Sequence, residues 1–122
     1  MMKKIANLWQ CFADKNYRRG FAVSHAGGFL AAQIYSMRTA QGWSKRALAL
    51  AIGSDQTHTT DFETSCEFAS LPLLQSIADA FDVALVVKFV SFSELASEAA
   101  TATPDSHVPS FDDEVELLAG MM

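Results

Sequence analysis

Apolar residues recur along most of this chain at every third or fourth position, the spacing typical of amphipathic α-helices. Residues 4–13 carry the first such stripe, and Asp14 can cap a second helix directly after it. The glycine pair at 27–28 predicts a break, and residues 29–41 then form a third helix that Gly42 closes. The side chains expected to face inward are Ile5, Leu8, Trp9, Phe12, Tyr17, Phe21, Val23, Leu30, Ile34 and Met37.

Three polar residues mark the starts of further helices. Ser44 can cap a helix that ends at Gly53, where a turn with positive φ suits glycine. Asp55 can cap a helix over residues 56–64, and Ser70 can cap another helix after a short loop. The side chains expected to face inward from the first and last of these helices are Ala47, Leu48, Ala51, Ile52, Leu71, Leu74, Ile77, Ala78 and Phe81.

The segment Val83–Val90 is rich in β-branched residues and contains no helix breaker, so we expect it to be a β-strand. A single strand leaves its backbone groups unpaired and therefore needs a partner. Pairing with the same strand of a second copy gives an antiparallel ribbon across a two-fold axis. Pairing with a C-terminal segment such as Val115–Leu118 is the alternative within one subunit. The residues assigned to dimerisation are Val83, Leu85, Val87 and Phe89.

Charge is distributed unevenly along the 122 residues, which carry a formal net charge of −5. Residues 1–50 contain eight Lys or Arg and one acid, whereas residues 51–122 contain one base and thirteen acids. The first part therefore has a net charge of +7 and the second of −12. This asymmetry allows a basic, phosphate-binding face on an acidic protein, although a solvated acidic tail explains it equally well.

Composition argues against an exported protein, a membrane protein and an enzyme. Cys11 and Cys66 have no CxxC partner, and the apolar start is broken by polar residues, so we expect a cytoplasmic location. The longest strongly apolar run, Val83–Val87, is too short to span a bilayer. The histidines show no ligand spacing with the cysteines, so we expect no metal site. Without a phosphate loop or nucleophile elbow, we expect no cofactor and no catalytic residue.

The stretch from Ser44 to Glu63 carries the most information about function. Two helical segments meet at a single glycine, as in a helix-turn-helix, whose helices cross steeply and touch near the turn. Such a pair needs a very small residue at the crossing, a turn residue that accepts positive φ, and apolar residues that join the pair to the core. These requirements are met by Ala49, Gly53, Leu48, Ile52 and Phe62.

Most of the chain resembles the Cro/CI-type (XRE) helix-turn-helix regulators of bacteria and phages. The resemblance rests on AQIYSMRTAQGWSKRALALAIG, on DQTHTTDFE in the place of the recognition helix, and on SLPLLQSIADAFDVALVVKFVSFSEL. The chain departs from the family pattern at four positions. The family usually has Gln in place of Lys45, an apolar residue in place of Ser54, Ile or Val in place of Thr59, and often a basic residue in place of Asp61. The last segment, with KNYRRGFAVSHAGGFLAAQI upstream, is similar to a subgroup with an extra N-terminal helix and a C-terminal strand.

The resemblance implies a mostly α protein, a lambda-repressor-like helical bundle with a helix-turn-helix and one C-terminal β-strand that pairs across a dimer. The expected divisions are an N-terminal helical extension (1–26), the helix-turn-helix domain (27–82), a dimerisation segment (83–98) and an acidic tail (99–122). It also implies a homodimeric repressor of transcription that occludes a promoter. The expected partner is double-stranded DNA with an inverted-repeat operator.

The DNA-contacting residues are expected on the second helix of the pair and around the start of the first. Base contacts are assigned to Gln56, Thr57, Thr60 and Asp61, since Gln can pair with adenine and a carboxylate can accept from a cytosine amino group. Phosphate contacts are assigned to Arg38, Lys45, Arg46 and His58.

Two other functions compete with a repressor. An antitoxin combines this kind of DNA-binding domain with a segment that masks a toxin, and the tail from Ala99 onward could be that segment. A protein-binding module with a degenerate helix-turn-helix is the other, and it is motivated by Asp55, Asp61 and the acidic second half of the chain.

Overall fold

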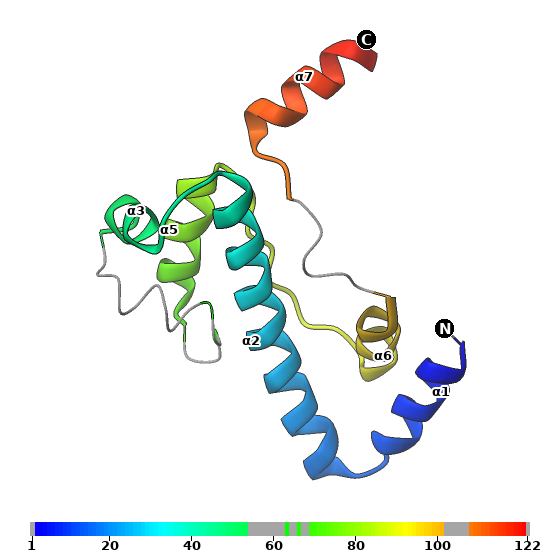
Figure 1. Cartoon of the computed structure of the whole chain (residues 1–122). Helices are drawn as coiled ribbons and strands as arrows, with labels where there is room; N and C mark the ends of the chain where they lie inside the picture. The colour runs from blue at the N-terminus through cyan, green and yellow to red at the C-terminus, as the bar shows by residue number, and fades with distance from the viewer. Residues whose placement is uncertain (1, 54–62, 64–65, 67–68, 102–107, 122) are drawn as a thin grey trace.

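The computed structural model describes residues 2–53, 63, 66, 69–101 and 108–121, and this part of the chain is mostly helical (Figure 1). Its described residues form six α-helices and contain no β-strand. The helices are α1 (Met2–Cys11), α2 (Lys15–Ala40), α3 (Lys45–Ala51), α5 (Leu71–Phe81), α6 (Phe92–Thr101) and α7 (Phe111–Met121).

The long helix α2 is the axis of the molecule, and it runs through the glycine pair where we expected a break. That expectation was wrong, because each glycine costs a helix only about 1 kcal/mol while packing against both halves of α2 outweighs the loss. Asp14 caps α2 as predicted, since its Oδ1 accepts from the N–H of Tyr17 at 2.9 Å. The boundary drawn between residues 26 and 27 therefore lies inside one continuous helix.

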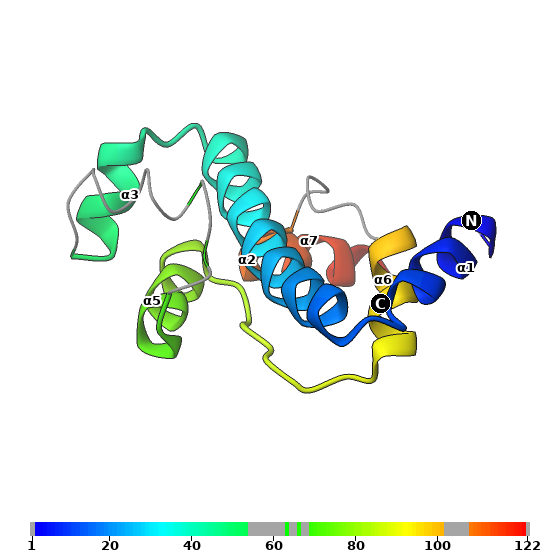
Figure 2. The same ribbon diagram turned by 90° about the horizontal axis from the view of Figure 1, so that it is seen from below.

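The two halves of α2 lie beside different helices (Figures 1 and 2). They contribute to two separate apolar clusters. The main core joins the C-terminal half of α2 to α3 and α5, and its buried members are Ala31, Ile34, Met37, Leu48, Cys66, Ile77 and Phe81. The second core joins the N-terminal half of α2 to α1 and α6, and its buried members are Phe12, Leu95 and Ala96.

Aromatic and cationic contacts hold the second core together. Phe12 meets Phe21 and Phe92 edge to face, with ring centroids 5.3 and 5.4 Å apart. The Arg18 guanidinium donates to the carbonyl of Phe12 at 3.2 Å and lies 5.8 Å from the ring centre of Phe92. The N-terminal extension thus packs against α6, a helix from the other end of the chain.

The helix ends that the sequence predicts at Ser44, Ser70 and Gly42 are found in the structure at those residues. Ser44 Oγ and Ser70 Oγ accept from the N–H groups of Ala47 and Leu73 at 3.0 and 3.3 Å. Gly42 ends α2 with φ of +71°. Inward residues were predicted less well, since several expected inward residues are exposed. The exposed ones are Trp9, Tyr17, Val23, Ala51 and Leu71.

Residues 83–90 form an extended connection alongside α2 instead of a strand in this single chain (Figure 2). Val83 packs against the main core, whereas Phe89 is fully exposed at 106%. The pairing with Val115–Leu118 that we considered is wrong, because those residues belong to helix α7. The described part of one subunit therefore offers this segment no strand to pair with.

The C-terminal helix α7 extends away from the other helices at the top of Figure 1. Ser110 and Asp113 form a reciprocal capping box, with Asp113 N–H donating to Ser110 Oγ at 3.3 Å and Ser110 N–H to Asp113 Oδ2 at 3.4 Å. The N–H of Phe111 donates to Asp82 O at 3.0 Å and so ties the start of α7 to the end of α5. No helix in the described ranges has the length and apolarity needed to cross a membrane.

Helix α3 offers a matched pair of leucines for testing the main core. Leu48 is completely buried and Leu50 is 72% exposed on the same helix. We expect Leu48→Ala to lower the free energy of unfolding by about 2–5 kcal/mol, because it removes apolar contacts and leaves a cavity. Leu50→Ala should change it by less than about 0.5 kcal/mol. Urea denaturation followed by circular dichroism measures both, and equal losses would contradict this packing.

Candidate nucleic-acid interface

The predicted DNA-contacting residues fall into one group inside and one outside the described part of the chain. Arg38 lies in α2, and Lys45 and Arg46 lie in α3. The others lie outside the described residues: Gln56, Thr57, His58, Thr60 and Asp61. The structure describes the residues that flank this group in the sequence, Gly53 on one side and Glu63 on the other.

The first turn of α3 carries two adjacent basic residues. Arg46 is exposed and Lys45 is half-buried, so both side chains have access to solvent. The α3 sequence KRALALA contains no carboxylate. Helix α3 itself is therefore positively charged, although the whole chain is acidic.

The turn after α3 has the conformation that the sequence predicts. Gly53 has φ of +70°, a region that residues with a side chain rarely adopt, so the prediction of positive φ here is confirmed. Ala49, which we expected at the helix crossing, is only 2% exposed. A small buried side chain at this point lets a neighbouring segment approach the α3 backbone closely.

Arg38 has an internal role and is not placed to contact phosphate, contrary to the sequence prediction. Its guanidinium forms an ion pair with the carboxylate of Glu63, in which Nε donates to Oε1 and Nη2 donates to Oε2 at 3.2 Å. Nη1 donates to the carbonyl of Trp43 at 2.8 Å. The Arg38 and Glu63 side chains are only 10% and 7% exposed, so these contacts leave little guanidinium surface for another anion.

The structure shows that Glu63 does not add an unbalanced negative charge to this region. By sequence alone, Glu63 adds negative charge to the same stretch as Asp55 and Asp61. In the structure its charge is balanced by Arg38 within a two-point hydrogen-bonded pair. Only the two aspartates then bear on the electrostatics of the segment between Gly53 and Glu63.

Trp43 fixes the loop that leads into α3. Its ring stacks on Phe81 of α5 with centroids 5.0 Å apart and planes 23° from parallel. Its backbone N–H donates to the carbonyl of Arg38 at 3.0 Å, and its own carbonyl accepts from the Arg38 side chain. The position of Lys45 and Arg46 thus depends on a loop held at Trp43, a role that the sequence analysis missed.

Cys66 anchors the chain beyond Glu63 against the middle of α2. Its backbone N–H donates to the carbonyl of Gly27 at 3.2 Å. Cys66 is 6% exposed and belongs to the main core. Burial raises the pKa of the Cys66 thiol from 9.0 to about 11, because an apolar environment disfavours the thiolate.

The described residues contain no group of three or more His, Cys, Asp or Glu side chains that could hold a metal ion. Comparisons with protein-family models, with curated proteins and with solved structures find no match to this chain.

The Arg38–Glu63 pair can be tested by removing one partner at a time. We expect Arg38→Met to lower the free energy of unfolding by about 3–5 kcal/mol, because a buried carboxylate is left without its counter-charge. Glu63→Gln should also destabilise, and the double variant should lose less than the sum of the two single variants. Urea denaturation measures all three. Arg46→Met is the exposed control, and an Arg38→Met variant as stable as that control would contradict the buried pair.

The two cysteines should differ sharply in reactivity with iodoacetamide. Only thiolate reacts, and a pKa near 11 makes the thiolate fraction of Cys66 about 100-fold smaller at mildly alkaline pH than a thiol of pKa 9.0 would have. In Cys11→Ser we therefore expect alkylation at Cys66 to be at least about 100-fold slower than alkylation of the exposed Cys11 in Cys66→Ser. Mass spectrometry over time gives both rates, and equal rates would place Cys66 at the surface.

Proposed function

We propose that this chain is a dimeric, sequence-specific double-stranded DNA-binding regulator of the helix-turn-helix type that represses transcription by occluding a promoter. One observation carries the proposal most directly. The nine residues between Gly53 and Glu63 are held at both ends on one scaffold, by a left-handed glycine turn after α3 and by the Arg38–Glu63 ion pair. A recognition helix needs such fixed ends, because base readout depends on the register of side chains in the major groove.

The chemistry between these anchors supports base contacts. Gln56 at the start of the proposed helix can pair with adenine through two hydrogen bonds, which contributes about 1–3 kcal/mol of discrimination. Thr57, Thr60 and Asp61 have the sequence spacing that would put them on one face of the proposed helix, and Asp61 is proposed to accept from the amino group of cytosine. Phosphate contacts are proposed for Lys45, Arg46 and His58, and Arg38 is left out of that set because Glu63 binds it.

The extended segment 83–90 supports the proposed dimer. Val83 packs against the main core and Leu85 is half-buried, so these two side chains anchor the segment to its own subunit. Val87 is 64% exposed and Phe89 is fully exposed, which leaves them available to a second copy. We propose that the two segments pair as an antiparallel ribbon and so place two recognition helices on the half-sites of an inverted repeat.

An antitoxin-like role is the second candidate, and α7 favours it. Every residue of this helix up to Gly120 is exposed, and four acids occupy its sequence. Phe111, Val115 and Leu118 recur at the spacing of one helix face, each at least 45% exposed. An acidic helix with one apolar stripe fits a groove that is apolar at its base and basic at its rim. A protein-binding module without DNA affinity would use the same helix.

DNA binding is tested by selecting bound duplexes from a random-sequence library and measuring affinity for the selected site against salt concentration. We expect affinity to fall steeply with salt, because each phosphate contact releases counterions. The double variant Lys45→Gln/Arg46→Gln should reduce the slope of log affinity against log salt by about 2. Lys3→Gln/Lys4→Gln removes the same charge from α1 and should leave the slope unchanged.

Three outcomes would count against the proposal in different ways. A nearly flat salt dependence contradicts phosphate contacts. A selected sequence that stays the same for Asp61→Ala and Asp61→Arg contradicts a base-reading role for that residue. Failure to enrich any duplex, together with co-purification of the product of a neighbouring small gene, replaces the repressor by a protein-binding function.

A further inference from the structure

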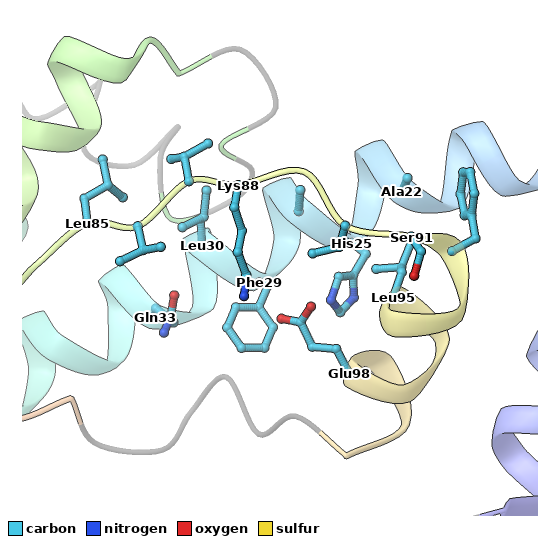
Figure 3. A pocket seen from close by; sticks show the side chains of 15 residues that line it. Ala22, His25, Phe29, Leu30, Gln33, Leu85, Lys88, Ser91, Leu95 and Glu98 are labelled. Carbon is cyan, nitrogen blue, oxygen red and sulfur yellow. The ribbon is translucent and has the colours of Figure 1, made fainter.

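A pocket of about 450 Å³ lies between the middle of α2 (residues 22–33), the extended segment 85–91 and α6 (Figure 3). Its volume falls within the range of about 300–1,000 Å³ that is usual for small-molecule sites. Phe29, Leu30 and Leu95 give it an apolar lining, and none of the described lining residues belongs to α3 or α5. The pocket is therefore separate from the proposed DNA-binding face.

His25 places a hydrogen-bonding atom in this apolar pocket. Its ring stacks on Phe21 with centroids 5.8 Å apart and planes 7° from parallel, and the ring of Phe29 lies 5.6 Å away on the next turn of α2. The Nε2 atom of His25 is buried and has no hydrogen-bond partner among the described residues. An unpaired buried polar atom costs about 1–3 kcal/mol, so a ligand that pairs with Nε2 would recover this penalty.

Two residues of opposite charge stand at the same pocket. Lys88 comes from the extended segment and Glu98 from α6, and both side chains point toward the space over Phe29 (Figure 3). Neither makes an ion pair with any described residue. Their charges cancel, so the pocket as a whole favours neither an anion nor a cation.

We propose that this pocket binds a small, flat, uncharged amphipathic molecule. Its ring system would lie against Phe29 and Leu95, and one polar group would hydrogen-bond with Nε2 of His25. Lys88 and Glu98 would hydrogen-bond polar substituents at the rim. The rival occupant is the exposed Phe89 of a second copy, and the experiment below separates the two.

The probe for this proposal is 1-aminoanthracene, a neutral aromatic amine whose fluorescence increases in apolar surroundings. We expect saturable binding of one probe molecule per full-length chain. His25→Phe retains the aromatic stacking but removes Nε2, so it should weaken binding by about 2- to 10-fold, the equivalent of one hydrogen bond. Ala26→Trp puts a large side chain on the pocket wall and should abolish binding. Asn16→Trp adds the same side chain at an exposed α2 position outside the pocket and should leave the affinity unchanged.

Circular dichroism and thermal unfolding confirm that each variant folds, and the measurement does not depend on DNA binding. The proposal is overturned by a folded wild-type protein that shows no saturable fluorescence, or by Ala26→Trp binding the probe as well as Asn16→Trp does. Unchanged affinity of His25→Phe overturns the assigned hydrogen bond. Binding that appears only in Phe89→Ala shows that a second copy fills the pocket, and this too overturns the proposal.

Discussion

The buried guanidinium of Arg38 determines how several segments meet at the C-terminal end of α2. A cation with so little exposure needs a counter-charge and hydrogen-bond acceptors nearby, and Glu63 and the carbonyl of Trp43 supply them. Glu63 is thereby held beside α2, and the loop before α3 is held at Trp43. The stretch that starts at Gly53 must therefore return to α2 within ten residues, which defines where the proposed recognition helix can lie.

The sequence predicted those features of the fold that depend on a few neighbouring residues. The caps at Ser44 and Ser70 and the positive φ of Gly53 act within about one helical turn, so the residues themselves signal them. The continuity of α2 through its glycines was not predictable in this way, because it depends on packing against segments far along the chain. The packing of α6 against α1 was not predictable for the same reason, because the two helices lie far apart in the chain.

The candidate site also contains features that depend on neighbouring residues and features that depend on residues far apart in the chain. Its scaffold residues Leu48, Ala49 and Gly53 could be identified from spacing and residue size. The pairing of Arg38 with Glu63 joins residues 25 positions apart, and no local pattern indicates that the two charges neutralise each other. The molecule thus combines a proposed DNA-binding end around α3 with a pocket against the middle of α2, where the segment 85–91 forms one wall.

The most direct test of the proposed interface is an amide NMR titration of the ¹⁵N-labelled protein with a selected duplex. Tight DNA binding through the anchored segment predicts chemical-shift changes concentrated in residues 54–62 and at Lys45 and Arg46. The N–H groups of α1 and α6 should change little, and the Arg38 side-chain Nε–H signal should keep its position because Glu63 holds it. Changes centred on α1, α6 or α7, with residues 54–62 unaffected, would contradict the account.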